Sequence, residues 1–529
     1  MTVSEYIAKE LKNRGVKYVF GIPGGPSIPL IEEIGKTGIE FILTSHESAA
    51  AIMADVTGRL TGIPGICHST YGPGATNLNT GVGGAMLDRS PMIALTSVMS
   101  EKMRKRTAQM NIDHQLLFEP TTKASVIISN ENIKDVLTDS FDLAKEEYPG
   151  PIHLGIPTDQ LLKQVNEKGS RSPDKENSSS LLVDDELIEL LEYSRRPLLA
   201  LGLTAARAGI KDELLNFLNE FTIPVVLTPM AKGLIDEDHE CYCGVLFHAA
   251  SDKLSTVINE ADLVIGLGYD PVEYNYESWL PDVPLIHLNT VYTDMPEGIM
   301  VKQVIGSLSG LLSMISPPLK SKPDWDIGTI SLCRNQIQSL VKRGYDNFGP
   351  VKVLEIMQDL LPDNNILCLD VGSHIHLFGQ YWRPSGPEKL LMTNGWSGMG
   401  FSIPAAIAAA LNKPDIPVAC VTGDGGFLMM CGEMVTARRL NLGVLFIILA
   451  DRELNLIKLK EQKQGMKSGG SEMYTGNLIG EKSFLGVPVL SCSDETSFRE
   501  ALSGLYPMKG PLILDVAIDP SDYQKLIVT

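Results

Sequence analysis

The stretch Val418–Glu453, which reads VACVTGDGGFLMMCGEMVTARRLNLGVLFIILADRE, decides how this chain folds. It opens with an apolar run, Val418–Thr422, and passes through the glycine-rich turn Gly423–Gly426 into a helical pattern that extends to about Leu440. A second apolar run, Val444–Leu449, follows. A strand, a helix and a strand in this order form one right-handed βαβ unit, so we predict two neighbouring parallel strands.

Two aspartates follow these strands. Asp424 and Asp451 are expected at the carboxyl ends of the two strands, which is the edge where open α/β sheets bind ligands. Gly425 and Gly426 let the backbone approach a phosphate closely. Two carboxylates beside a phosphate repel each other unless a cation lies between them, and Mg²⁺ takes oxygen ligands from both groups. We therefore predict a phosphate and metal site; the alternative is a tight turn in which Asp424 caps a helix.

The same alternation runs through all 529 residues. Short β-branched runs alternate with longer helical patterns, which is typical of parallel sheets covered by helices. A polar linker at 166–182 and a proline-containing stretch between 317 and 327 interrupt the alternation. We predict an α/β protein of three doubly wound parallel-sheet domains at 1–165, 183–317 and 327–529. The strands expected outside the opening stretch are Tyr18–Gly21, Phe41–Leu43, Gly65–Ser69, Met92–Thr96, Pro197–Leu201, Pro224–Leu227, Leu263–Leu267, Pro284–Leu288, Ile366–Leu369 and Leu512–Val516.

Composition excludes several classes of partner. The formal net charge of −19 argues against a nucleic acid or an anionic membrane surface, since both need a basic protein face. No apolar run approaches the roughly 20 residues of a membrane span, and Met1–Glu10 lacks a signal-peptide core. The eight cysteines are scattered, as is usual in a reducing compartment. We expect a cytoplasmic enzyme with no nucleic-acid or membrane partner.

Five blocks of the chain, taken in order, resemble the thiamine diphosphate (ThDP) enzymes. The resemblance covers essentially the whole chain and is closest to acetolactate synthases of the flavin-independent, catabolic type. It implies that the three domains bind the pyrimidine ring, form a central Rossmann-like unit and bind the diphosphate. The blocks are Ser45–Ala51, Ser69–Leu78, Gly150–Asp159, Asn394–Phe401 with Pro404–Ala406, and Gly423–Asp451.

The resemblance assigns residues to ThDP and Mg²⁺. Glu47 matches the single glutamate bonded to the pyrimidine N1′, although it could instead be an ordinary carboxylate at a helix N-terminus. Met399 matches the side chain that props the bent cofactor, and Ser397 the backbone carbonyl beneath its amino group. Glu453 is expected to bind the metal with its backbone carbonyl, beside the Asp424 and Asp451 side chains. The remaining cofactor contacts implied are Gly72, Gly372, Ser373, His374, Gly425 and Gly426.

A second set of residues is implied for the substrate. Gln115 resembles the glutamine near the reacting carbonyl, and its amide can donate a hydrogen bond without adding charge. Gly25, with Gly24 before it, would let backbone N–H groups reach the developing oxyanion, although either glycine could be a turn residue. His114 could donate a proton in a simple decarboxylase. Lys123 stands where some relatives contact substrate or flavin.

Four positions depart from the family pattern. Ala450–Asp451 replaces the usual pair of asparagines, and an aspartate is the harder metal ligand. Lys460 stands where biosynthetic enzymes have a tryptophan, and Tyr71 replaces a serine. The block 268–274 resembles the flavin-free enzymes, and Gly266-Leu267-Gly268 lacks the third glycine of a dinucleotide motif. We therefore expect the central domain to hold neither FAD nor ADP.

The resemblance implies a carboligase that decarboxylates a 2-oxo acid such as pyruvate and joins the product to a second carbonyl compound. Two alternatives stay open, a 2-oxo acid decarboxylase and a cofactor-binding paralogue without turnover. In the family the N-terminal domain of one chain meets the C-terminal domain of another across the cofactor. A homodimer or homotetramer is therefore expected, with Glu47 and Asp424 of one site coming from different subunits.

Overall fold

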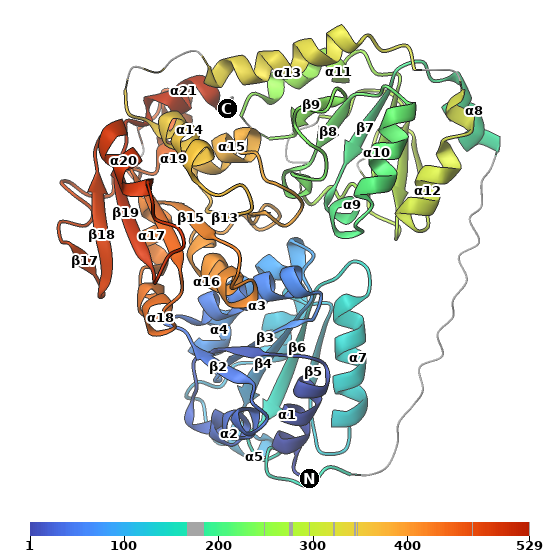
Figure 1. Ribbon diagram of the computed structural model, residues 1–529. Helices are drawn as coiled ribbons and strands as arrows, with labels where there is room; N and C mark the ends of the chain where they lie inside the picture. The colour runs from blue at the N-terminus through green and yellow to red at the C-terminus, as the bar shows by residue number, and fades with distance from the viewer. Residues whose placement is uncertain are drawn as a thin grey trace.

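Three sheets divide the chain into an N-terminal, a central and a C-terminal lobe (Figure 1). The structure is a computed structural model and describes residues 1–166, 185–247, 249–273, 279–295, 297–320, 323–342, 345, 347–467 and 469–527. The predicted linker at 166–182 lies outside the described residues except for Asn166. Each sheet is covered by helices, and the predicted α/β class is confirmed.

The N-terminal sheet is entirely parallel and has the order β2-β1-β3-β4-β6-β5. Its strands are buried on both faces where helices cover them; β4, for example, is buried at all seven positions. The strands are β1 (Tyr18–Gly21), β2 (Glu40–Leu43), β3 (Gly65–Ser69), β4 (Met92–Val98), β5 (Ala124–Ile127) and β6 (Pro151–Pro157). The helices are α1 (Val3–Asn13), α2 (Ile28–Lys36), α3 (Glu47–Thr61), α4 (Pro73–Leu87), α5 (Glu101–Arg104), α6 (His114–Phe118) and α7 (Ile133–Lys145), with short 3₁₀ turns η1 (Gly25–Ser27) and η2 (Glu119–Thr121).

The central sheet is also entirely parallel and has the order β12-β11-β10-β7-β8-β9. Helix α13 follows the predicted break at 317–327, yet it packs on β9 of this sheet, since a Cβ added at Gly244 would lie 2.7 Å from Ile337 Cδ1. The predicted domain boundaries therefore stay predictions. The strands are β7 (Pro197–Leu201), β8 (Val225–Leu227), β9 (Tyr242–Val245), β10 (Leu263–Leu267), β11 (Leu285–Asn289) and β12 (Val301–Ile305). The helices are α8 (Asp185–Tyr193), α9 (Leu203–Arg207), α10 (Lys211–Glu220), α11 (Ser255–Ile258), α12 (Leu308–Ile315) and α13 (Ile327–Val341), with 3₁₀ turns η3 (Pro229–Ala231), η4 (Ser251–Leu254) and η5 (Pro318–Lys320).

The C-terminal sheet has the order β14-β13-β15-β16-β19-β18-β17, and only the edge strand β17 is antiparallel to its neighbour. The predicted pairing of the opening stretch is confirmed, since Gly423 of β15 lies opposite Leu449 of β16. The single helix predicted after the glycine turn is wrong in one respect: it is broken into α17 and α18 around Gly432. The strands are β13 (Ile366–Leu369), β14 (Leu390–Leu391), β15 (Val418–Gly423), β16 (Val444–Ala450), β17 (Ser483–Phe484), β18 (Val487–Cys492) and β19 (Leu512–Ala517). The helices are α14 (Pro350–Leu360), α15 (Ser373–Tyr381), α16 (Ser402–Asn412), α17 (Asp424–Met430), α18 (Glu433–Arg439), α19 (Asn455–Gln464), α20 (Glu495–Leu502) and α21 (Tyr523–Leu526), with the 3₁₀ turn η6 (Pro520–Asp522).

Small side chains join the N-terminal and C-terminal lobes. Helices α3, α4 and α16 contribute buried residues to one hydrophobic core, in which alanines are frequent. Figure 1 shows α16 lying beside α3 where the two lobes meet. A Cβ added at Gly81 of α4 would lie 2.6 Å from Ala51 Cβ of α3, so these two helices touch almost backbone to backbone. The start of α3 is thereby fixed relative to both lobes.

Candidate active site

Helix α3 begins at Glu47, and the C-terminal lobe fixes its first turn. His46 caps the helix, since its Nδ1 accepts a hydrogen bond from the Ser48 N–H at 3.2 Å. Glu433 Oε1 accepts the backbone N–H groups of Ser45 and His46 at 2.7 and 3.1 Å. The Ser45 hydroxyl also donates to the Gly432 carbonyl at 2.8 Å. A buried carboxylate of α18 therefore holds the residues that precede Glu47.

The Glu47 carboxyl group lies against α4. Its side chain is buried, and Oε2 accepts a hydrogen bond from Asn77 Nδ2 at 3.0 Å. A Cβ added at Gly74 would lie 3.2 Å from Oε1, so the glycine leaves room for the carboxyl. Glu47 is thus a helix N-terminal residue, as the alternative interpretation held, and it is also held in one orientation by a neighbouring helix.

The turn before α4 requires a glycine and rests on His114. Gly72 has φ +68°, and an added Cβ would lie 2.9 Å from Met110 Cβ. Its N–H points to His114 Nε2 at 3.4 Å, so the ring proton resides on Nδ1, which lies 2.8 Å from Thr96 Oγ1. Burial lowers the pKa of His114 to about 4. His114 is therefore a buried neutral histidine, which does not suit the predicted role of proton donor.

Thr96 continues this chain of hydrogen bonds to His153. Thr96 Oγ1 lies 2.8 Å from His153 Nε2, and His153 Nδ1 lies 2.7 Å from Ser125 Oγ. Burial lowers the pKa of His153 to about 3, so it too is neutral. The two histidines tie α6 to strands β4, β5 and β6.

The other residues predicted for the substrate differ in their surroundings. Gln115 is half-buried, and its Nε2 donates to the Ser125 carbonyl at 3.5 Å. Gly24 is needed for close approach, since a Cβ there would lie 2.5 Å from Thr70 Oγ1, whereas nothing lies within 4 Å of a Cβ at Gly25. The Lys123 ammonium donates to the carbonyls of Glu146 and Tyr148, away from Glu47.

Asp424 and Asp451 lie together at the carboxyl edge of the C-terminal sheet. Gly423 is the N-cap of α17, so the alternative in which Asp424 caps the helix is wrong. Asp424 Oδ1 accepts the Gly425 N–H at 2.9 Å, and burial raises its pKa. Burial and the nearby Asp424 raise the pKa of Asp451 to about 8. The two carboxylates therefore repel each other, as the sequence predicted.

Asp370, at the end of β13, joins the Met399 loop to this edge. Its carboxylate is fully buried and accepts hydrogen bonds from the Val371 and Gly400 N–H groups and the Thr422 and Ser402 hydroxyls, at 2.8, 2.7, 2.7 and 3.2 Å.

The glycines of the turn leave room for these neighbours. A Cβ added at Gly426 would lie 2.3 Å from Asp370 Oδ2, and one at Gly425 would lie 3.0 Å from Met399 Cε. Met399 is thus brought against the glycine turn. Ser397 is exposed, has φ +54°, and donates to the Asn394 carbonyl at 2.9 Å.

A chain of hydrogen bonds connects the predicted diphosphate and metal residues. The Ser373 hydroxyl donates to Asn455 Oδ1 at 3.0 Å, and Asn455 Nδ2 donates to Glu453 Oε1 at 3.1 Å. The Glu453 carboxylate is also paired with Lys458.

His374 places a buried ring nitrogen without a partner at the same edge, among the described residues. Its ring is buried over Gly372, where a Cβ would lie 2.7 Å from its Cε1. Within the described part of the chain its Nε2 has no hydrogen-bond partner. A buried polar atom without a partner calls for an explanation, and a ligand group bound at this edge would provide one.

The residues at this edge fit a magnesium diphosphate group. Asp424 and Asp451 supply two carboxylates, and His374 supplies an unused polar atom. The described residues contain no group of three or more His, Cys, Asp or Glu side chains that could hold a metal ion. Further ligands would have to be backbone carbonyl or phosphate oxygens, which is the usual situation for Mg²⁺.

The structure brings the predicted residues together in two groups. Glu47, Gly72, His114 and Gln115 belong to the N-terminal lobe, and the diphosphate and metal residues belong to the C-terminal lobe. Among the described residues no hydrogen bond or ion pair connects Glu47 with the second group. The two groups are therefore contributed by different lobes of the chain.

Comparison with known proteins shows that both groups of residues belong to domains of one enzyme family. Three family models match, described as the N-terminal TPP binding domain, the central domain and the C-terminal TPP binding domain of thiamine pyrophosphate enzymes, over residues 1–117, 185–314 and 370–516. A probable acetolactate synthase large subunit of Methanocaldococcus jannaschii is 30% identical over 99% of this chain and 93% of its own length. The chain belongs to the acetolactate synthase-like family of ThDP-dependent enzymes.

Other members of the acetolactate synthase-like family are similar over nearly their full length. An acetolactate synthase of Bacillus subtilis is 27% identical over 98% of this chain and 93% of its own length. A catabolic acetolactate synthase of Raoultella terrigena is 26% identical over 98% of this chain and 95% of its own length. The predicted resemblance is thereby confirmed at the level of the family.

No helix among the described residues has the length and apolar character needed to cross a bilayer.

The hydrogen bonds of the structure also identify residues of the site that the sequence did not indicate. Asn77 lies within a family block, and its spacing from Glu47 on two packed helices gave no separate signal. Asp370 follows a predicted strand, which was the one available hint. Glu433, Asn455 and Tyr474 act on partners 2 to 388 residues away, and no short motif marks them.

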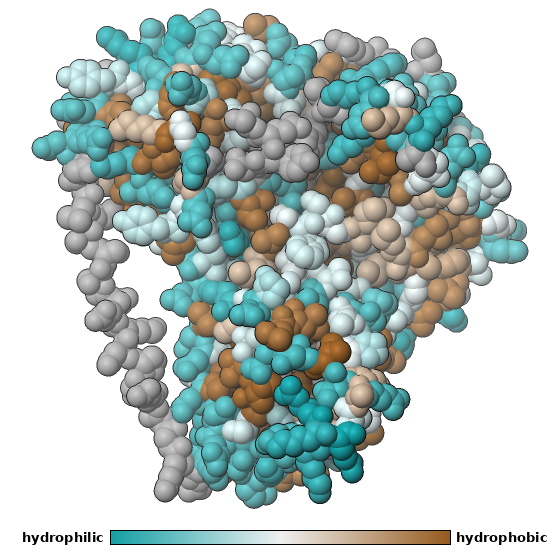
Figure 2. Space-filling view, turned by 180° about the vertical axis from the view of Figure 1, so that it is seen from behind, coloured by the Kyte–Doolittle hydropathy of each residue, from teal (hydrophilic) through white to brown (hydrophobic). Residues whose placement is uncertain are grey.

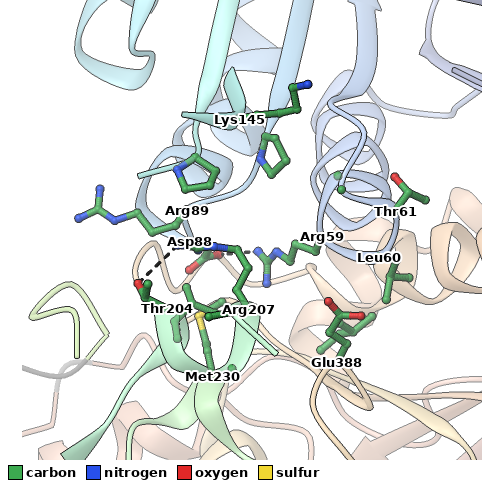
Figure 3. A pocket seen from close by; sticks show the side chains of 18 of the residues that line it. Arg59, Leu60, Thr61, Asp88, Arg89, Lys145, Thr204, Arg207, Met230 and Glu388 are labelled. Carbon is green, nitrogen blue, oxygen red and sulfur yellow. Dashed lines mark hydrogen bonds and ion pairs between the residues drawn. The ribbon is translucent and has the colours of Figure 1, made fainter. Parts of the chain in front are cut away.

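A cavity of about 500 Å³ lies where the three lobes of this family member meet (Figure 3). Arg59 and Asp88 of the N-terminal lobe form an ion pair there at 3.0 Å, and Arg207 of the central lobe points toward the same space. None of the residues predicted for ThDP, metal or substrate lines it. Tyr71 instead lines a small separate cavity with His114 and Gln115, and Lys460 is exposed on α19.

Proposed function

We propose that this protein is an acetolactate synthase-like carboligase that uses ThDP and Mg²⁺ to decarboxylate a 2-oxo acid such as pyruvate and joins the product to a second carbonyl compound. The observation that carries the proposal is the meeting of Asp424, Asp451 and Met399 at one sheet edge, in a chain that matches the family over its whole length.

ThDP, when bound, supplies the carbanion chemistry of such a reaction. The protein contributes a proton at Glu47. Because Oε2 already accepts a hydrogen bond from Asn77, Oε1 is the oxygen available to share a proton with the pyrimidine N1′. Met399, packed on Gly425, is the side chain suited to support a bent cofactor.

The chain's own groups account for the anchoring of the diphosphate. Asp424 and Asp451 would bind Mg²⁺, which removes their mutual repulsion, and the Glu453 carbonyl would add a third oxygen. Gly372, Ser373 and His374 would contact phosphate oxygens, with His374 Nε2 as the buried polar group that lacks a partner in the described residues.

The flavin-free character of the central domain is part of the proposal. Glu273 is buried at the carboxyl edge of the central sheet, and its two oxygens accept the N–H groups of Leu203 and Met230 at 2.8 and 3.1 Å. These backbone groups follow β7 and β8, where a dinucleotide phosphate would be bound in a Rossmann fold. Their use by an internal carboxyl supports the prediction that neither FAD nor ADP binds here. Tyr274 of the same block lies outside the described residues.

We also propose a homodimer or homotetramer in which each site uses two protomers. Among the described residues no hydrogen bond or ion pair joins Glu47 to the Asp424 group, which supports this arrangement. Figure 2 shows hydrophobic residues gathered on the surface of the N-terminal lobe, and Ile28 and Leu116 are 61% and 68% exposed. Exposed apolar surface of this kind is typical of subunit contacts. A cytoplasmic location stays a prediction.

The test is incubation of the purified protein with pyruvate, ThDP and Mg²⁺, followed by product analysis by mass spectrometry. Acetolactate is the expected product, and omission of ThDP or of Mg²⁺ should abolish it. Release of CO₂ with only an aldehyde would favour the decarboxylase. Binding of ThDP by calorimetry without consumption of any 2-oxo acid would favour the paralogue without turnover.

A further inference from the structure

The two oxygens of the Asp424 carboxylate have different hydrogen-bond partners. Oδ2 accepts two donors, the Arg452 N–H at 2.7 Å and the Tyr474 hydroxyl at 2.9 Å. Oδ1 accepts only the N–H of the next residue, Gly425, at 2.9 Å. Oδ1 is therefore the oxygen with a lone pair left for a cation.

Backbone pairing holds Tyr474 beside the metal loop. The Leu454 N–H donates to the Ser471 carbonyl at 2.7 Å, and the Met473 N–H donates to the Arg452 carbonyl at 3.0 Å. An antiparallel bridge also links Glu453 to Glu472. The segment that ends in Tyr474 thus runs alongside the residues that follow Asp451, and its hydroxyl reaches Asp424 from a fixed position.

We propose that Tyr474 is a positioning residue for Asp424 as a metal ligand. This inference rests on the function proposed above, in which Asp424 binds Mg²⁺. Its hydroxyl and the Arg452 N–H hold Oδ2 and thereby turn Oδ1 toward the divalent cation. A carboxylate that accepts two donors on one oxygen also carries less charge toward its neighbour.

Loss of a hydrogen bond that orients a metal-binding side chain typically lowers metal affinity by about 10- to 100-fold. We expect Tyr474→Phe to weaken Mn²⁺ binding by about 10-fold in the full-length protein saturated with ThDP, measured by electron paramagnetic resonance. The spectrum of the bound Mn²⁺ should change, because one ligand oxygen is no longer held. Turnover should recover at saturating Mg²⁺, with KM for the 2-oxo acid unchanged.

The matched control is Tyr506→Phe. Tyr506 belongs to the same lobe, and within the described residues its buried hydroxyl has no hydrogen-bond partner. This variant should match the wild type in affinity and spectrum. If Tyr474→Phe also matches the wild type, or if it lowers only the melting temperature of the metal-free protein, the proposal is overturned. Wild-type protein that fails to bind Mn²⁺ with ThDP would instead contradict the proposed function itself.

Discussion

Glu47 illustrates how much of this site is built by single contacts from other elements. Glu433 holds the backbone of the two preceding residues, Asn77 donates to its Oε2, and the absence of a side chain at Gly74 leaves space around Oε1. The contacts of Asn77 and Gly74 restrict the carboxyl without placing a charge beside it. Such restriction is what a group that shares a proton at one atom requires.

Glu47→Gln should abolish turnover, with a loss of at least about 100-fold, because an amide cannot hold or return the proton. Binding of ThDP with Mg²⁺ should be largely kept, since Asp424 and Asp451 belong to another lobe. Steady-state kinetics and calorimetry measure the two effects. Glu40→Gln, at an exposed position of β2, is the control and should behave as wild type. Normal turnover in Glu47→Gln would show that another residue contacts the pyrimidine.

The sequence was sufficient to predict that Asp424 and Asp451 lie at one edge of the sheet, because both directly follow apolar strands of one βαβ unit. It was not sufficient for Asn77 or Tyr474. Each of these hydrogen-bonds a site residue 30 or 50 positions away, and such contacts leave no periodic pattern. The role of His114 as a proton donor stays a prediction, and its burial could not be predicted because it depends on elements that are distant in sequence.

At the scale of elements, the packing of α3 on α4 determines where Glu47 and Asn77 meet. The closest approach is at Gly81, where an added Cβ would overlap Ala51. Helices in contact at this distance have no freedom to accept a larger side chain. The glycine therefore controls the relative position of two site residues that it does not touch.

Gly81→Ala should lower the free energy of unfolding by about 1–3 kcal/mol, because the added methyl group forces the helices apart. It should also reduce turnover by displacing Asn77 from Glu47. Urea denaturation and kinetics measure these effects. Gly35→Ala on α2 is the control: nothing lies within 4 Å of its Cβ, so it should leave stability unchanged or raise it by up to about 1 kcal/mol. Equal stability of the two variants would contradict the packing argument.

The histidine pair between α6 and the N-terminal sheet predicts a pH dependence of stability. Burial depresses the folded-state pKa of His114 to about 4 and of His153 to about 3, from an ordinary value of 6.5. Their contribution is therefore fully present above pH 6.5 and is lost as the pH falls, because only the unfolded chain takes up protons.

Each histidine contributes a slope of up to about 1.4 kcal/mol per pH unit between about pH 6.5 and about pH 4. In His153→Gln the fall in unfolding free energy should be shallower by about that amount. Urea titrations at several pH values in this window measure the difference. Parallel curves for the variant and the wild type would mean that His153 is protonated in the folded protein.

Elements with strong apolar runs were predicted well, and short or irregular ones were not. Strand β15 is confirmed to within one residue. The hairpin β17–β18 was missed, because it turns through Leu485 and Gly486 with positive φ and contains Pro488, which weakens any strand pattern. The break between α17 and α18 was also missed, since a glycine within a helical pattern need not end it.

For the whole molecule, the main observation is that the two halves of the site come from different lobes, with no hydrogen bond or ion pair between Glu47 and the Asp424 group among the described residues. If they meet between protomers, the site next to one chain's Glu47 uses the partner's aspartates. A mixed dimer can test this, because one defective half from each chain leaves one complete site.

Co-expression of Glu47→Gln and Asp424→Asn chains should restore about a quarter of wild-type turnover. Random assortment makes half of the dimers mixed, and each mixed dimer has one intact site of two. Differently tagged chains allow the mixed species to be purified and assayed. Each variant alone should be inactive. An inactive mixed dimer would mean that both residues serve a site within the same chain.

The number of lobes followed from two breaks in the pattern of the sequence, whereas their contacts could not be predicted. The pairing of α3 with α16 depends on small residues, and runs of alanine are equally common in isolated helices. Helix α13 lies on the central sheet because Ile337 packs against β9 there, which no local signal indicated.

The contact of Glu433 with Ser45 and His46 has a practical consequence for engineering. A chimaera that takes its first 165 residues from a relative could keep each residue proposed for catalysis, because one parent supplies the N-terminal set and the other supplies the C-terminal set. It would nevertheless disturb the contact between Glu433 of α18 and the loop residues Ser45 and His46. Domain exchange in this protein should therefore replace the Ser45–His46 loop and Glu433 together.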